Sequence, residues 1–319
     1  LRALLEALDD KTILILVGDA DQLASVGTGT VFQDIVSILE MSSSTDLVRL
    51  KHCFRADLAL VAINDAVRTG DKMAFDTAWR LAQDQDRVVM HPVVDRTALQ
   101  ARLSNWCRKL KTMLIDIGAF AKCSHTPEQI KQILDGLKSM QLLCAHREGL
   151  FGSEMAAASI ELQLRKAIPE YANALWYPGR VVMITQNDYA NDLFNGDVGI
   201  CLADQSGNIH VWFEGPSSGS GSLSLESELP NVRGFSSGSL AFHQCAFAVT
   251  VHKCQGSEYE HVAVLLPPEK DSAILSRQLL YTALTRAKRK AELWCTDEVL
   301  GEVIVSNIQR NASLRLRLG

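Results

Sequence analysis

The sequence lacks long hydrophobic runs, and this absence excludes a class of protein. Its longest apolar stretches, at residues 12–17 and 262–266, are far shorter than the roughly 18 to 20 residues of a membrane-spanning helix. Residues 1–16 carry acidic side chains such as Glu6 and Asp9, where a secretory signal peptide has its apolar centre. We therefore expect a cytoplasmic protein with no membrane partner.

The sequence also lacks paired cysteines and a strong charge of either sign. None of its eight cysteines is spaced as C-x-x-C, which disfavours zinc and thioredoxin-like sites and indicates reduced, mostly buried thiols. The net charge of −5 argues against non-specific nucleic-acid binding by the whole surface, but it permits one local groove for a strand. No carboxylates cluster at metal-ligand spacing, so we predict neither a metal site nor nuclease chemistry in this chain.

What is present is a globular composition with an α/β pattern. A chain of 319 residues, with 47% hydrophobic and 22% charged residues, suits a protein of about two domains. Residues 1–8 and 31–39 have helical patterns, and the apolar run at residues 12–17 predicts a buried parallel strand between them.

Residues 51–140 have mainly helical patterns. One stripe of apolar residues at helical spacing predicts a buried face: Leu99, Leu103, Trp106, Leu110 and Leu114. A second helix is predicted after Thr126-Pro127-Glu128, where threonine suits the cap and proline the first helical position. A strand at residues 141–146 and a helix at residues 154–166 follow.

From residue 180 the pattern becomes β-rich before the α/β pattern returns. Asn195-Gly196 is a strong hairpin-turn dipeptide, and residues 215–222 have the Ser/Gly composition of a flexible loop. A helix is predicted at residues 277–287. The predicted strands lie at residues 181–185, 198–202, 209–213, 244–251, 261–266 and 290–295.

Two polar segments follow predicted strands. Gly18-Asp19-Ala20-Asp21-Gln22-Leu23 comes after residues 12–17, at a strand end where ligands gather in parallel sheets. By itself it is either a magnesium-binding strand end or a capped turn. The segment from Val249 to Glu258 (V-T-V-H-K-C-Q-G-S-E) offers hydroxyl, imidazole and amide groups to a sugar-phosphate chain or a ribose, and the alternative is a structural histidine.

Two arginine-containing segments add to these. Residues 280–287 (L-Y-T-A-L-T-R-A) place Arg286 late on a predicted helix, where its charge could reach a γ-phosphate across an interface. The alternative is that Arg286 to Lys290 form a solvated basic face. Cys53-Phe54-Arg55 sets an aromatic ring beside an arginine, which is a common pattern by itself.

In order and spacing these four segments resemble the later motifs of superfamily 1 DNA helicases. The G-D-x-x-Q-L segment resembles motif III, the aromatic-Arg segment motif IV, the T-V-H-K-x-Q-G-S-E segment motif V, and the Y-T-A-x-T-R-A segment motif VI. The RecD type is suggested by four further stretches, at residues 22–26, 142–149, 187–188 and 193–199. Cys254 stands where serine is more usual in this group.

The resemblance implies an α/β fold with RecA-like P-loop NTPase motor domains, the first of them truncated, and a small inserted SH3-like β domain. The implied division assigns residues 1–140 to the end of the first motor domain with a helical region. Residues 141–179 and 243–319 form the second motor domain, and residues 180–242 form the insert.

The resemblance also implies roles at a nucleotide site between the motor domains. Gln22 is expected to sense the γ-phosphate and its attacking water, and Arg55 and Arg286 to act as paired arginine fingers. The remaining expected nucleotide contacts are Asp19, Phe54 stacking on adenine, and Gly256 and Glu258 at the ribose. The residues expected to bind single-stranded DNA are Thr250, His252, Gln255, Arg147 and Asn195.

Two further motifs of such helicases are missing from the sequence. It contains no G-x-x-x-x-G-K-[S/T] loop for the phosphates and no apolar strand ending in Asp-Glu for Mg²⁺. We therefore expect the C-terminal portion of an ATP- and Mg²⁺-dependent 5′–3′ DNA helicase, inactive alone, whose parent is the RecD alpha subunit of exodeoxyribonuclease V beside RecB and RecC. The alternatives are a stand-alone RecD-like or conjugative-relaxase helicase, and a non-catalytic module that binds DNA or other subunits.

Overall fold

The computed structural model describes residues 2–9, 11–23, 31–42, 44–50, 56–215, 230–269 and 274–306. Contacts divide the described residues into two units, residues 2–50 and residues 56–306. In the part of the chain that the structure describes, no helix is long and apolar enough to cross a membrane.

Two helices are described in the first unit, α1 (Arg2–Glu6) and α2 (Val31–Met41). The prediction of a buried strand at residues 12–17 was wrong, because these residues form no strand and the side chains of Ile13 and Val17 are 86% and 89% exposed. A parallel strand needs neighbours to pair its backbone groups. No described strand pairs with this segment.

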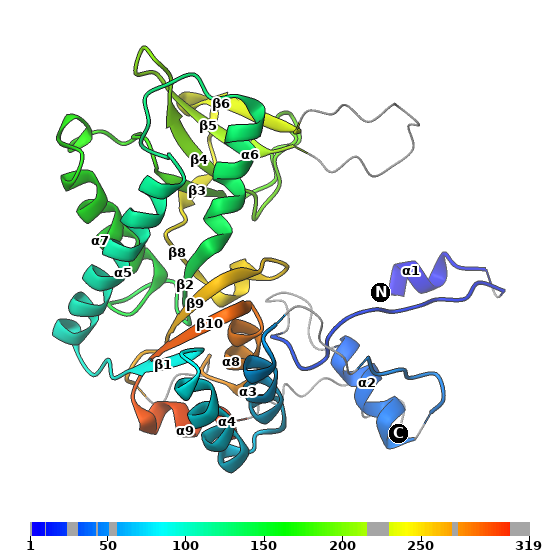
Figure 1. Cartoon of the computed structure of the whole chain (residues 1–319). Coiled ribbons are helices and arrows are strands. Elements are labelled where there is room, and N and C mark those ends of the chain that lie inside the picture. The colour runs from blue at the N-terminus through cyan, green and yellow to red at the C-terminus, as the bar shows by residue number, and fades with distance from the viewer. Residues whose placement is uncertain are drawn as a thin grey trace. The chain divides into compact units, whose positions relative to one another are not determined.

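The second unit contains a parallel five-stranded sheet, in the order β1-β10-β9-β2-β8. Its strands are β1 (Val88–His91), β2 (Met140–Cys144), β8 (Ala248–Thr250), β9 (Tyr259–Leu265) and β10 (Ala287–Trp294). Figure 1 shows helices on both sides of this sheet. They are α3 (Leu58–Thr69), α4 (Lys72–Asp84), α5 (Arg96–Asp116), α7 (Ser153–Lys166), α8 (Arg277–Leu284) and α9 (Asp297–Val305). The mixed α/β fold is thus confirmed.

An antiparallel five-stranded sheet, in the order β6-β5-β4-β3-β7, forms the rest of this unit with α6 (Pro127–Gly136). Its strands are β3 (Val181–Ile184), β4 (Val198–Ala203), β5 (Ile209–Glu214), β6 (Val232–Ser236) and β7 (His243–Cys245). Four short 3-10 helices are described: η1 (Leu137–Ser139), η2 (Pro169–Tyr171), η3 (Ser237–Ser239) and η4 (Val251–Cys254). The SH3-like character of this sheet stays a prediction.

The chain passes directly from one sheet to the other. The single strand predicted at residues 244–251 is in fact two strands, because β7 pairs with β3 in the antiparallel sheet and β8 pairs with β2 in the parallel sheet. Strand β1, which the sequence did not predict, adds an edge to the parallel sheet by pairing with β10. Contacts therefore group residues 52–140 with the second unit, and the division into motor domains stays a prediction.

The predicted apolar stripe of α5 is confirmed as core. Its five residues are at most 4% exposed, and Trp106 packs edge-on against Trp294 of β10 with ring centroids 5.7 Å apart. The predicted cap of α6 is confirmed as well, because Thr126 and Gln129 form a reciprocal capping box. These contacts hold the helical region to the sheet that carries the candidate site.

Candidate functional site

The segments that resemble motifs V and VI meet at the amino-terminal edge of the parallel sheet. Residues 256–258 lead into β9, and Arg286 leads into β10. The two strands begin side by side, with Tyr259 paired to Ala287, and the backbone N–H of Tyr259 donates to the carbonyl of Arg286 at 2.8 Å. Pairing between the strands therefore sets the distance between the two segments.

Arg286 is buried beneath the turn that carries Glu258. Arg286 is only 7% exposed. Its guanidinium donates to the carbonyl oxygens of Thr282 at 3.2 Å and Ser257 at 3.3 Å. The guanidinium thus joins the end of α8 to the 256–258 turn. In this arrangement it is a structural clamp, and its role as an arginine finger stays a prediction.

Glu258 forms an ion pair with Lys288 at the same edge. The Glu258 Oε2 to Lys288 Nζ distance is 3.5 Å, and the two side chains are 24% and 38% exposed. The carbonyl of Lys288 also accepts a 2.9 Å hydrogen bond from the backbone N–H of Asp57. Because Asp57 lies two residues after Arg55, the chain after the predicted motif IV is anchored beside motifs V and VI. Phe54 and Arg55 themselves lie outside the described residues.

Gly256 makes the turn possible. Its φ of +86° is in the left-handed region that favours glycine, and a Cβ placed there would meet open space. The turn therefore presents an uncovered backbone next to the Glu258 carboxylate. Such a surface suits a sugar that approaches closely.

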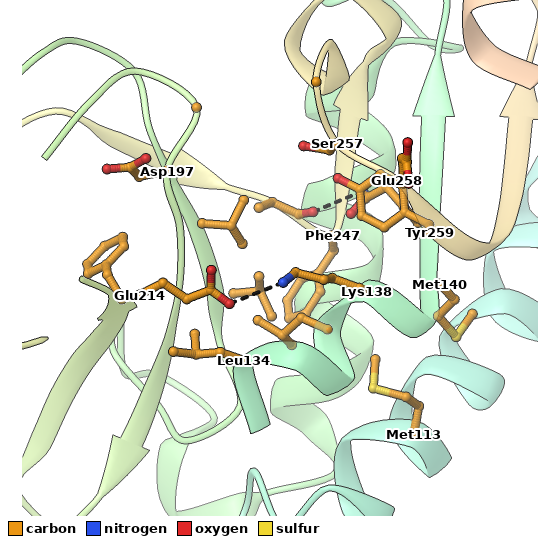
Figure 2. A pocket seen from close by; sticks show the side chains of 18 of the residues that line it. Met113, Leu134, Lys138, Met140, Asp197, Glu214, Phe247, Ser257, Glu258 and Tyr259 are labelled. Atoms are coloured by element: carbon orange, nitrogen blue, oxygen red, sulfur yellow. Dashed lines mark hydrogen bonds and ion pairs between the residues drawn. The ribbon is translucent and has the colours of Figure 1, made fainter. Parts of the chain in front are cut away.

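A pocket of about 440 Å³ opens beside this turn. Figure 2 shows Ser257, Glu258 and Tyr259 on one side of it and Asp197, from the β3–β4 hairpin, on the other. The ammonium of Lys138 lies 3.1 Å from the carboxylate of Glu214 across the same space. Ten apolar side chains contribute to its lining: Leu110, Met113, Leu134, Leu137, Met140, Val181, Val198, Phe213, Ala246 and Phe247. The pocket therefore has an apolar wall between two lysine–carboxylate pairs.

Several predicted DNA contacts lie at the opposite, carboxyl-terminal edge of the sheet. Thr250 ends β8 opposite Cys144, the last residue of β2. His252 follows in η4, and Arg147 follows β2 in the neighbouring loop. Thr250 is buried, His252 is half-buried and Arg147 is exposed. Gln255 is also exposed and lies between the two edges, just before the 256–258 turn.

Two cationic side chains, Lys253 and Arg147, lie near each other at this carboxyl-terminal edge. Burial lowers the pKa of Lys253, and the nearby charge of Arg147 lowers it further. The Lys253 ammonium donates to Gln244 Oε1 at 2.6 Å, and the Arg147 guanidinium is paired with Glu154 at 2.7 Å. Two cations close enough to perturb each other suit a polyanionic chain.

Asn195 lies apart from these residues, on the β3–β4 hairpin of the antiparallel sheet. It is exposed, and its backbone N–H donates to Asn187 Oδ1 at 2.9 Å. Its neighbour Gly196 lines the pocket. The structure thus brings Asn195 to the pocket side rather than to the edge that carries Thr250.

Asp19 and Gln22 belong to the first unit. Gln22 Nε2 donates to Asp19 Oδ2 at 2.9 Å, and the Asp21 N–H donates to Asp19 Oδ1 at 3.0 Å. Gln33 of α2 holds the segment through a 3.0 Å hydrogen bond to the carbonyl of Gln22. The segment is a capped turn whose carboxylate orients the glutamine.

The described residues do not form a magnesium site by themselves. No group of three His, Cys, Asp or Glu side chains among them could hold a metal ion. The carboxylate of Asp19 already accepts hydrogen bonds from its own turn. A Mg²⁺ ion at a phosphate site usually takes one or two carboxylates together with phosphate oxygens and water.

Lys288 is the site residue that the sequence did not indicate. The sequence of residues 286–290 is compatible with a solvated basic face at a helix end, but β10 begins at Ala287. The register of β10 against β9 shifts between Ala287 and Lys290. At this irregularity Lys288 reaches Glu258, while Arg289 is 78% exposed and pairs with Glu260. Polar and apolar residues alternate only further along, at residues 290–293, so the basic run itself gave no strand signal.

Comparison with known proteins gives matches along nearly the whole chain. Residues 245–293 match the UvrD-like helicase C-terminal domain, and residues 1–92 match a family described as AAA domain. The RecD subunit of the RecBCD enzyme from Mycobacterium tuberculosis is 32% identical over 99% of this chain and 50% of its own length. The corresponding subunit from Mycolicibacterium smegmatis is 30% identical over 99% of this chain and 51% of its own length.

More distant matches were also found. The ATP-dependent RecD2 DNA helicase of Deinococcus radiodurans is 25% identical over 90% of this chain and 33% of its own length. A solved structure of Pif1 helicase from Bacteroides in complex with ADP-AlF3 and ssDNA covers 91% of this chain and 63% of its own, with 15% identity and a TM-score of 0.37. The chain spans about half the length of the curated relatives it matches, and over nearly its whole length it is similar to RecD-type superfamily 1 DNA helicases.

Proposed function

We propose that the protein containing this chain is an ATP-dependent DNA helicase of the RecD type that moves 5′ to 3′ on single-stranded DNA. We further propose that it works with RecB and RecC subunits as exodeoxyribonuclease V, in double-strand-break repair and DNA degradation. The observation that supports this most strongly is the meeting, at one sheet edge, of the two segments that resemble motifs V and VI with the chain that follows the predicted motif IV. Asp57 is hydrogen-bonded to Lys288, Lys288 is paired with Glu258, and Arg286 is bonded to Ser257.

In this proposal the two edges of the parallel sheet have different tasks. Glu258 and Gly256 receive the ribose at the amino-terminal edge, and Arg286 holds their turn in place. Thr250 and His252 contact the DNA strand at the carboxyl-terminal edge. Because η4 and the following turn connect β8 to β9, a shift of the turn on nucleotide binding would move the DNA contacts. ATP, when bound, supplies the phosphoryl chemistry that drives this movement.

The test is carried out on the full-length protein. We expect ATP hydrolysis stimulated by single-stranded DNA, and unwinding of duplexes with a 5′ tail but not with a 3′ tail. Arg286→Ala should lower turnover by about 10³- to 10⁵-fold if the arginine acts as a finger. Arg289→Ala is the matched control, since Arg289 is on the same strand but exposed. Equal turnover in Arg286→Ala and Arg289→Ala would show that Arg286 has no role in the nucleotide site.

The chain by itself is expected to be inactive. It contains neither the G-K-[S/T] loop nor the Asp-Glu strand end, so the phosphates and Mg²⁺ lack their main ligands. A steady-state ATPase assay with single-stranded DNA should show no turnover above background. Clear turnover by this chain alone would contradict the proposal.

A stand-alone RecD-like helicase is the second candidate, favoured by the match to RecD2. Affinity purification of the tagged full-length protein from its native cells distinguishes the two. Stoichiometric RecB and RecC support the subunit, whereas an active helicase without them supports the stand-alone enzyme. The third alternative, a non-catalytic DNA-binding or subunit-contact module, requires that the gene upstream of Leu1 encodes no G-K-[S/T] loop.

A further inference from the structure

We propose that Lys288 is a positioning residue that holds the Glu258 carboxylate toward the ribose of the nucleotide. It thereby sets how strongly the enzyme prefers a nucleotide that carries the ribose hydroxyl contacted by Glu258 over a deoxynucleotide that lacks this hydroxyl. The inference rests on the proposed function, because it assigns a role within the same site. It does not follow from the motif pattern, since Lys288 lies after the last residue of the Y-T-A-x-T-R-A segment.

Backbone contacts fix the position of Lys288 independently of its side chain. The residue before it, Ala287, pairs with Tyr259 across the two strands. Its own carbonyl accepts the 2.9 Å hydrogen bond from Asp57, and Asp57 caps α3 through the N–H of Ala59. The starting point of the lysine side chain is therefore determined by a strand on one side and a helix cap on the other.

The turn that carries Glu258 is fixed independently. The buried Arg286 guanidinium donates to the Ser257 carbonyl at 3.3 Å, and β9 begins one residue after Glu258. With both backbones held, the 3.5 Å ion pair between Lys288 and Glu258 selects the rotamer of the glutamate. An unconstrained glutamate side chain would lose more rotamer freedom when it binds a ligand.

The ion pair is compatible with ligand binding. An ionised carboxylate has two oxygens and about four lone-pair positions, so an ammonium at Oε2 leaves capacity to accept a hydroxyl hydrogen bond. The pair is only partly buried, and the pocket beside it is lined by Gly256, Ser257 and Glu258. A sugar hydroxyl can therefore reach the carboxylate without displacing the lysine.

The key variant is Lys288→Met, which keeps the length of the side chain and removes the charge. In the full-length protein we expect KM for ATP to rise about 3- to 5-fold, as for loss of a partly exposed ion pair, with a smaller effect on kcat. We compare kcat/KM for ATP with kcat/KM for 2′-deoxy-ATP and for 3′-deoxy-ATP. The preference for ATP should fall in the comparison with the analogue that lacks the hydroxyl contacted by Glu258. Lys288→Arg should restore most of the lost preference.

The matched control is Lys290→Met. Lys290 is on the same strand and also forms an ion pair, but with Asp86. Its KM and its deoxynucleotide ratios should equal those of the wild type. In a Glu258→Gln background, Lys288→Met should have no additional effect on these ratios, because the group it positions has lost its charge.

The outcomes separate this inference from the proposed function. A wild-type protein without DNA-stimulated ATP hydrolysis refutes the proposed function. An active wild type with unchanged KM and unchanged ratios in Lys288→Met refutes only the positioning role. An equal fall of this ratio in Lys290→Met also refutes the positioning role, because the loss of any positive charge on the strand would then explain the effect.

Discussion

Replacing the buried Glu292 by glutamine should destabilise the second unit by a predictable amount. Glu292 is 2% exposed in the middle of β10. Its carboxylate lies 2.7 Å from the Lys109 ammonium and 3.1 Å from His261 Nε2, and it accepts a 3.0 Å hydrogen bond from the Trp294 indole. The group therefore joins α5 to the sheet that carries the candidate site.

The magnitude follows from these contacts. Loss of a partner from a buried ion pair costs about 3 to 5 kcal/mol, but Lys109 is 45% exposed, and its ammonium can regain water. We therefore expect the free energy of unfolding to fall by about 2 to 3 kcal/mol. For a unit of this size the melting temperature should fall by about 5 to 10 °C.

The difference should depend on pH. Burial alone raises the pKa of Glu292, but hydrogen bonds from His261, Lys109 and Trp294 outweigh it and hold the pKa well below the ordinary value of 4.5. A carboxyl whose pKa is lower in the folded state stabilises fully above its unfolded pKa and loses that contribution as the pH falls below it. The melting difference between wild type and Glu292→Gln should thus be complete at pH 6 to 7 and shrink below about pH 4.5.

Glu260→Gln is the control for this experiment. Glu260 is on the neighbouring strand β9, and its pair with Arg289 is exposed on both sides. Its loss should change the melting temperature by no more than about 2 °C. If Glu292→Gln melts within the same small interval of the wild type at pH 7, the reasoning about this buried network is refuted.

Three further predictions concern the two edges of the sheet in the full-length protein. His252→Ala should raise the concentration of single-stranded DNA needed for half-maximal ATPase stimulation, and an unchanged value would exclude a DNA contact. Arg147→Ala should lower the slope of log affinity against log salt by about 0.7 to 1, which a salt titration of DNA binding measures. Gly256→Ala should raise KM for ATP, because alanine at φ +86° is strained by about 1 kcal/mol; Gly238→Ala, in open space without a positive φ, should not.

The sequence alone predicted much of the local structure. Helical spacing marked the buried face of α5, and the Thr126 cap marked the start of α6. Asn195-Gly196 lies between the paired strands β3 and β4, but in a connection at residues 185–197 that is longer than a two-residue hairpin turn. These features depend on interactions between residues close in the chain, so the pattern is enough to predict them. The order of the four motif segments predicted the helicase family to which the chain proved similar.

Only the tertiary structure decided which residues share an edge of the sheet. The segment from Thr250 to Glu258 reads as one motif, yet Thr250 is at the carboxyl-terminal edge while Glu258 is at the amino-terminal edge beside Lys288. The burial of Arg286 and the exposure of residues 12–17 were also invisible in the sequence pattern. Strand order and register bring together residues far apart in the chain, and a side chain's partner and exposure follow from that arrangement rather than from its neighbours in sequence.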